Sequence, residues 1–141
     1  MHTYYAVIDT NVLVSALLRK SSIPGMVIDF AIAGRIIPLI SDEIIAEYKD
    51  VLTRNKFDFK QEEINDLLRL FIKKGISLER TTTDECFPDS DDIVFYEIAL
   101  SGRSTMNAFL VTGNLRHYPA QHFVVTPREM IQIIEGHDPE L

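Results

Sequence analysis

Short runs of purely apolar residues constrain the fold of this chain more than any other feature of its sequence. The first run, residues 4–8 (Tyr-Tyr-Ala-Val-Ile), contains no charged or amide side chain. A strand with one face in water alternates apolar and polar residues, so a run without alternation is typical of a strand covered by helices on both faces. We predict strands over residues 4–8, 36–40, 76–78, 108–111 and 123–125. Pro38, in the second of these, indicates a position near a sheet edge or a bulge.

Helical patterns separate the predicted strands. We expect helices over residues 12–18 and 23–33, around residues 44–52 and 64–71, over residues 92–100 and after residue 126. Ser41 and the pair Thr126 and Glu129 have the pattern of N-caps, and Gly75 and Gly102 are expected to end helices. Strands that alternate with helices imply right-handed crossovers and a parallel sheet. The predicted fold class is therefore α/β, a three-layer α/β/α sandwich around a central parallel sheet of about five strands.

Length and composition are those of a compact intracellular protein. The chain has 141 residues, 46% of them hydrophobic, which is enough to form one domain over residues 1–141. No apolar run reaches the roughly 20 residues that span a bilayer, and the first residues do not have the pattern of a signal peptide. A lone Cys86 cannot form an internal disulfide, which fits a reducing compartment. We therefore expect a cytoplasmic protein without a membrane partner.

Acidic residues stand at the ends of predicted elements. Asp9 directly follows the first strand and Asn114 follows the fourth, so both should lie at the carboxyl edge of the sheet, where α/β proteins bind ligands. Asp91 and Asp92 open a buried helix, and Glu47 lies at the border of an apolar helix face. Four carboxylates from three segments would then converge. Because like charges repel, such a cluster implies a hard divalent cation, Mg²⁺ or Mn²⁺.

Each acid also has an ordinary structural interpretation. Asp9 can cap a turn or a helix, Asp91 and Asp92 can cap their helix and favour its dipole, and Glu47 can be a solvated helix residue. Only their joint placement indicates a site. The formal net charge of −7 opposes unspecific nucleic-acid binding, unless bound cations invert the local field.

Other chemistries have little support. The four histidines show no pairing at zinc-ligand spacing, and no glycine-rich phosphate loop or Gly-x-Ser-x-Gly elbow occurs.

Four sequence blocks, taken in order, resemble the PIN-domain ribonucleases. They are residues 7–13 (Val-Ile-Asp-Thr-Asn-Val-Leu), 41–48 (Ser-Asp-Glu-Ile-Ile-Ala-Glu-Tyr), 89–92 (Asp-Ser-Asp-Asp) and 110–114 (Leu-Val-Thr-Gly-Asn). The resemblance extends over about residues 4–135 and is greatest with the toxins of type II toxin–antitoxin systems that are relatives of the VapC toxins. It implies a Mg²⁺- or Mn²⁺-dependent endoribonuclease, an RNA substrate, a cognate antitoxin protein and a homodimer.

The resemblance also assigns roles by position. It implies that Asp9, Glu47 and Asp92 are metal ligands, and that Asp91 is a further catalytic acid or an alternative ligand.

Three neutral residues match supporting positions in the family, namely Asn11, Thr112 and Asn114. Asn114 is the departure, because many members have an aspartate there, and a neutral amide leaves it open whether one or two metal ions bind. Flanking phosphates could be held by the basic residues Arg19, Lys20, Arg54, Lys56, Arg103 and Arg116, each of which is otherwise a surface charge.

Two other functions compete with the ribonuclease. An inactive PIN-like module that only binds RNA or a protein is favoured by Asn114. A phosphatase of the haloacid dehalogenase kind also has an aspartate after its first strand, but it needs a second aspartate where this chain has Asn11. Its paired acids should also follow the later strand, whereas Asp91 and Asp92 precede residues 108–111.

Overall fold

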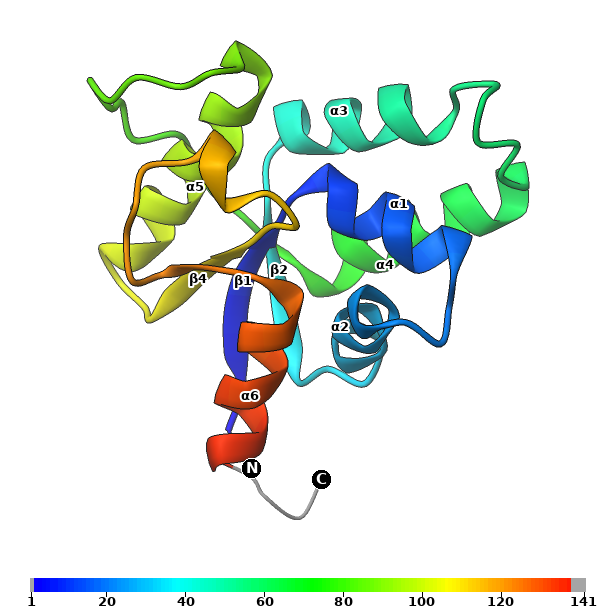
Figure 1. The fold of residues 1–141 in the computed structure, drawn as a ribbon, viewed down its shortest axis with the longest axis horizontal. Helices are drawn as coiled ribbons and strands as arrows, with labels where there is room; N and C mark the ends of the chain where they lie inside the picture. Colours follow the sequence, from blue (N-terminus) through cyan, green and yellow to red (C-terminus); the bar gives the residue numbers. More distant parts are fainter. Residues whose placement is uncertain (1, 138–141) are drawn as a thin grey trace.

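The computed structural model describes residues 2–137 and has the predicted three-layer α/β/α architecture (Figure 1). The central sheet has five parallel strands in the order β3-β2-β1-β4-β5. They are β1 (Tyr4–Ile8), β2 (Ile36–Ile40), β3 (Ile76–Ser77), β4 (Ala108–Val111) and β5 (Val124–Val125). The middle strand β1 is buried as its apolar run predicts, with Ala6, Val7 and Ile8 at 0% exposure.

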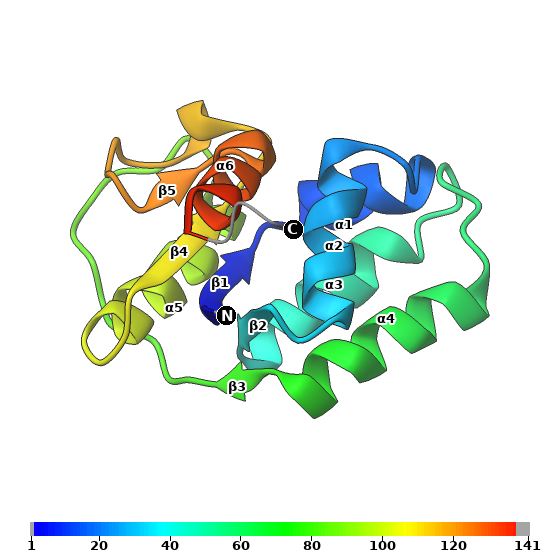
Figure 2. The same cartoon turned by 90° about the horizontal axis from the view of Figure 1, so that it is seen from below.

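Six α-helices cover the sheet in the described part of the chain. They are α1 (Thr10–Leu18), α2 (Ile23–Ile32), α3 (Asp42–Leu52), α4 (Gln61–Lys74), α5 (Ile93–Arg103) and α6 (Pro127–His137). α5 packs against β1, β2 and β4 on one face, whereas α2 and α6 pack together on the other (Figure 2). None of the helices within residues 2–137 has both the length and the apolar character needed to cross a membrane.

The predicted N-caps form. Ser41 Oγ accepts a hydrogen bond of 3.2 Å from the backbone amide of Ile44 and begins α3. Thr126 and Glu129 exchange reciprocal bonds of 2.9 and 3.1 Å at the start of α6. These local signals therefore set where α3 and α6 begin.

The predictions for Gly102 and Pro38 had different outcomes. Gly102 is the last residue but one of α5 and not its C-cap. A Cβ on Gly102 would come within 2.8 Å of Leu39 Cδ1 and 3.0 Å of the Ala108 Cβ. Its role is to let α5 approach the sheet closely. Pro38 lies near the sheet edge, as predicted: it pairs with Ala6 of β1 on one side, and on the other side the short edge strand β3 meets β2 only at Leu39 and Ile40.

The strand order positions the functional residues. The chain moves from β1 outward to β2 and β3, and then returns to build β4 on the other side of β1. The ends of β1 and β4 therefore form the point where the strand order reverses, which is where sheets of this class bind ligands.

Candidate active site

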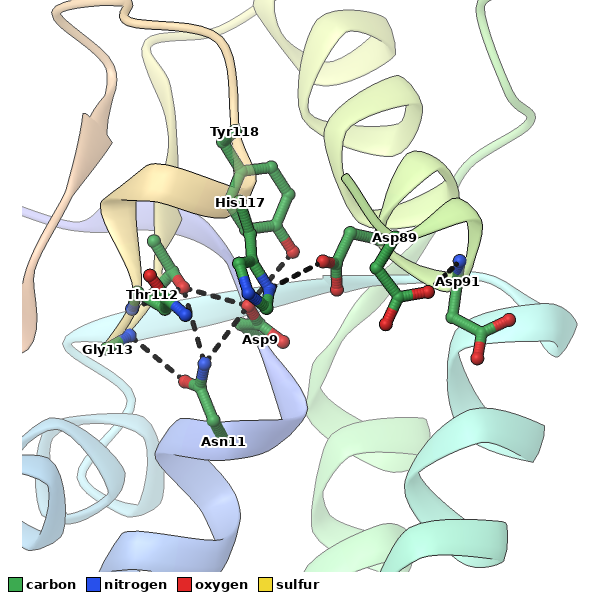
Figure 3. A network of polar contacts seen from close by, with 10 residues as sticks. Asp9, Asn11, Asp89, Asp91, Thr112, Gly113, His117 and Tyr118 are labelled. Carbon is green, nitrogen blue, oxygen red and sulfur yellow. Dashed lines mark hydrogen bonds and ion pairs between the residues drawn. The ribbon is translucent and has the colours of Figure 1, made fainter. Parts of the chain in front are cut away.

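Asp9 and Thr112 are neighbours because they follow neighbouring strands. Ile8 and Val111 pair in register, and the Asp9 amide donates to the Val111 carbonyl at 2.9 Å. Thr112 Oγ1 then donates to Asp9 Oδ2 at 2.8 Å (Figure 3). Both residues are buried, at 4% and 0% exposure.

Asn11, in the first turn of α1, joins the two strand ends. Its side-chain nitrogen lies 3.4 Å from Asp9 Oδ2 and 3.5 Å from Thr112 Oγ1. Its side-chain oxygen accepts a hydrogen bond of 3.0 Å from the backbone amide of Gly113. A Cβ on Gly113 would come within 3.3 Å of that oxygen. The amide of Asn11 is therefore oriented from both ends and turns its donor toward the carboxylate of Asp9.

Tyr118 is a contact that the sequence did not suggest. Its hydroxyl donates to Asp9 Oδ2 at 2.9 Å, and the side chain is buried. Burial raises the pKa of Asp9, and the hydrogen bonds from Thr112 and Tyr118 oppose that effect without reversing it. Burial together with the charge of Asp9 raises the pKa of the Tyr118 hydroxyl, so Tyr118 stays protonated and remains a donor.

Asp92 lies beside Asp9 at the start of α5. Burial, and next the charge of Asp9, raise the pKa of Asp92 to about 6, although His117 acts in the opposite direction. His117 Nδ1 is 2.9 Å from Asp92 Oδ2. An ionised carboxylate only accepts hydrogen bonds, so Nδ1 of His117 is the donor in this contact.

Glu47 and Asp91 form a second acidic group. Glu47 is half-buried on α3, and its pKa is raised by burial and then by the charges of Asp91, Asp50 and Asp89. Asp91 is exposed, and Asp89 Oδ1 accepts from its amide at 2.9 Å. Asp89 was not predicted as a site residue, yet its charge acts on both Glu47 and Asp92. The predicted acids therefore lie in two neighbouring groups at the carboxyl edge of the sheet.

Among the described residues, no three carboxylate, histidine or cysteine side chains already surround a single point. The donor set nevertheless suits a hard cation, because it consists of carboxylate and amide oxygens. Burial raises the pKa of Asp9, Asp92 and Glu47 alike, and the charges of neighbouring carboxylates add to this effect at Asp92 and Glu47. A divalent cation between the two groups would remove that unfavourable interaction.

Asn114 and the basic residues expected to hold phosphates do not all lie near the acids. Asn114 is half-buried at the start of the 3₁₀ turn Leu115–His117, and its backbone amide, not its side chain, bonds to Thr112 Oγ1 at 3.0 Å. Arg103 was expected near the site and is not, since it bonds to the Ala108 carbonyl at the amino end of β4. Arg54 pairs with Asp50 and Lys20 with Glu63, while Arg116 is exposed next to His117.

His117 and Tyr118 are the functional residues that sequence reasoning missed. They follow the Thr112-Gly113-Asn114 block by only a few residues, and the 3₁₀ turn folds them back over the strand ends (Figure 3). Their nearness to that block in sequence was the one available signal.

The fold and the acids at the switch point define the class of this protein. The sequence model of the PIN domain matches residues 5–116, and the chain belongs to the PIN-domain family. PIN domains are generally nucleases that act on nucleic acids and typically use divalent metal ions. An uncharacterized protein of Methanocaldococcus jannaschii, MJ1680, is similar to this chain, with 28% identity over 111 residues that cover 77% of this chain and 69% of the relative.

Proposed function

We propose that this protein is a Mg²⁺- or Mn²⁺-dependent endoribonuclease that hydrolyses RNA phosphodiester bonds. The observation that carries the proposal is the buried carboxylate of Asp9, held by Asn11, Thr112 and Tyr118 next to Asp92. A protein gains nothing in stability from bringing two buried carboxylates together, so their placement is explained by a ligand of opposite charge.

In this proposal Asp9, Asp92 and Glu47 are the metal ligands, and Asp91 is an alternative ligand or a base near Glu47. A divalent ion held there would neutralise phosphate charge and make water nucleophilic at neutral pH. Asp91, which is exposed next to Glu47, would accept the proton of the attacking water.

The supporting residues act on geometry. Thr112, Asn11 and Tyr118 fix the orientation of the Asp9 carboxylate through one oxygen, Oδ2. His117 does the same for Asp92 through Oδ2 of that residue. Ligands fixed in advance reduce the ordering that metal binding requires.

Cleavage of a fluorescent single-stranded RNA with and without divalent metal tests the proposal. We expect activity with Mg²⁺ or Mn²⁺, no activity in EDTA, and loss of activity in Asp9→Asn with its circular dichroism unchanged. Asp66→Asn is the matched control, because Asp66 is an exposed acid on α4 that pairs with Arg69. Cleavage in EDTA, or an active Asp9→Asn variant, would contradict the assignment.

We further propose that the nuclease is the toxin of a toxin–antitoxin pair and acts as a homodimer. The support is the resemblance of its four sequence blocks to VapC relatives. Induced expression of the wild type should slow growth, expression of Asp9→Asn should not, and coexpression of a small protein from the neighbouring gene should restore growth. Light scattering should give twice the monomer mass of 16.1 kDa.

A second candidate is a PIN-like module that binds without cleaving. It is favoured by Asn114 and by the absence, among residues 2–137, of three side chains that already surround a metal position. Calorimetric Mn²⁺ titrations of the wild type and Asn114→Asp separate the two. A nuclease with one ion should bind Mn²⁺, and the Asp variant should bind it more tightly because ligand charge increases affinity. Failure of both proteins to bind Mn²⁺ would favour the binding module.

A further inference from the structure

The loop between α3 and α4, residues 53–60, is a tight turn with an unusual backbone. The Phe57 amide bonds to the Arg54 carbonyl at 3.1 Å, and the Asp58 amide to the Asn55 carbonyl at 3.2 Å. Asp58 has a φ of 50°, the left-handed region that side chains other than glycine rarely adopt. The turn therefore has a defined conformation in which Phe57 and Phe59 lie on either side of Asp58.

The two phenylalanine rings of this loop are stacked. Their centroids are 5.3 Å apart and their planes differ by 6°. Phe59 packs against the apolar core, but Phe57 is not among the described residues that form or contact that core. Phe57 is thus a half-buried aromatic ring that rests on an anchored one, with no core contact of its own to explain it.

The loop is also positively charged in an acidic protein. Arg54, Lys56 and Lys60 are exposed, and Asp58 is the one acid within residues 53–60, while the whole chain has a net charge of −7. The Lys56 ammonium lies 5.0 Å from the centroid of the Phe57 ring. Proteins that bind single-stranded nucleic acid combine positive charge with aromatic side chains on which bases stack.

The loop continues directly from the candidate active site. α3 begins at the carboxyl edge of the sheet and ends at the loop (Figure 1). Glu47 is five residues before Leu52, the last residue of the helix, which is about 8 Å along its axis.

We propose that residues 53–60 are a binding site for single-stranded RNA, in which a base displaces the Lys56 ammonium from the ring of Phe57 and stacks there, while phosphates contact Arg54 and Lys56. The proposal rests on the ribonuclease function proposed above and specifies how the substrate is held. Arg54 would exchange its exposed partner Asp50 for a phosphate, at little cost because exposed ion pairs contribute little to stability. Base stacking tolerates any sequence, because every base has an aromatic face.

A tryptophan reporter tests the stacking directly, because the natural chain contains no tryptophan. The variant Phe57→Trp keeps an aromatic ring on Phe59, and its fluorescence should be quenched when oligouridine is added in EDTA, where metal-dependent cleavage is absent. Ile32→Trp is the control, because Ile32 is 52% exposed at the far end of α2. Its fluorescence should not change.

Fluorescence anisotropy of labelled oligouridine gives an independent measurement. Phe57→Leu should weaken RNA binding by about five- to a hundredfold, the range that loss of one stacked base produces. Unfolding curves that match the wild type show that this variant still folds.

The outcomes separate this site from the nuclease function. Oligouridine binding that leaves the tryptophan emission of the Phe57→Trp variant unchanged, or equal affinity of Phe57→Leu and the wild type, overturns the loop site. Absence of oligouridine binding in EDTA also overturns it. If metal-dependent cleavage persists in these cases, the proposed nuclease function stands without the loop site.

Discussion

At the scale of single residues, the candidate site depends on hydrogen bonds to carboxylates that burial makes unfavourable. Asp9 Oδ2 accepts from Asn11, which is two residues away, and from Thr112 and Tyr118, which follow β4 about a hundred residues later. Asp92 Oδ2 is bonded by His117. The prediction of Asp9 and Asp92 came from their places after a strand and before a helix. Their hydrogen-bond partners are evident only from the folded structure, in which distant segments of the chain meet.

We predict that Tyr118→Phe destabilises the protein by about 1–3 kcal/mol at neutral pH. The variant keeps the buried ring but removes one of three donors to a buried carboxylate, and a hydrogen bond to a charged group contributes about 1.5–3 kcal/mol. Urea denaturation in EDTA measures the change. Tyr5→Phe is the matched control, since Tyr5 is half-buried on β1 without a hydroxyl contact to the site. Equal stability of the two variants would mean that Tyr118 does not support Asp9.

We predict that His117→Ala weakens Mn²⁺ binding by roughly ten- to a hundredfold, because residues that orient a metal ligand typically contribute this much. His117→Asn should retain part of the affinity, since its amide can still donate to Asp92. Calorimetric titration measures both. His122→Ala serves as the control, because His122 contacts Arg103 at the opposite edge of the sheet. A loss of affinity in the His122 variant as large as in His117→Ala would argue against a specific role.

At the scale of elements, the irregular segment 78–89 is held by a buried ion pair. Glu97 on α5 has a side chain that is 7% exposed and lies 2.6 Å from an Arg80 guanidinium nitrogen. The other carboxylate oxygen of Glu97 accepts a hydrogen bond of 2.8 Å from the backbone amide of Thr83. Arg80 also reaches Glu43 of α3 at 2.7 Å. Arg80 therefore links α3 to α5. The rest of the segment leads to Asp89, which lies near Glu47 and Asp92.

We predict that Arg80→Ala destabilises the protein by about 3 kcal/mol or more, because it leaves the buried charge of Glu97 without its partner. Glu43→Ala should cost less than about 1 kcal/mol, because its side chain is 56% exposed and exposed ion pairs contribute little. Thermal and urea unfolding of both variants test this difference. Similar effects of the two substitutions would show that burial of Glu97 does not control the stability of the segment.

At the scale of the whole molecule, the acidic groups at the carboxyl edge of the sheet should make the free energy of unfolding depend on both pH and metal. The pKa of Asp92 is about 6 in the folded protein and 3.8 in the absence of the fold. The folded state therefore binds this proton more tightly than the unfolded state. Protonation of Asp92 therefore stabilises the folded state. This contribution is complete below about pH 4 and is lost as the pH rises through about 6. The pKa values of Asp9 and Glu47 are raised in the same direction.

We predict that the metal-free protein loses on the order of 2–3 kcal/mol of stability, relative to Asp92→Asn, between pH 4 and pH 7. Mn²⁺ at a hundredfold excess over its dissociation constant should restore about 2.7 kcal/mol to the wild type at pH 7. Calorimetric melting in EDTA and in Mn²⁺ measures both effects, with Asp66→Asn as the control. Parallel pH curves for the wild type and Asp92→Asn, with no shift in Mn²⁺, would mean that the acids do not form a cation site.

The sequence by itself determined the elements and the edge at which the acids lie. The apolar run of β1, the caps at Ser41 and Thr126, and an aspartate directly after a strand are local signals, because each depends on residues only a few positions apart. They predicted the parallel α/β/α sandwich and the carboxyl-edge position of Asp9.

Only the tertiary structure decided which side chains meet at that edge. Tyr118 contacts Asp9 across 109 residues, and this contact exists because β4 returns to the side of β1 and the following turn folds back over both strand ends. The same strand order carries Arg103 to the opposite edge and divides the acids into one group around Asp9 and Asp92 and another around Glu47 and Asp91. Periodicity and caps report on neighbours along the chain, whereas contacts across the sheet follow from how apolar surfaces pack, and no local pattern encodes that order.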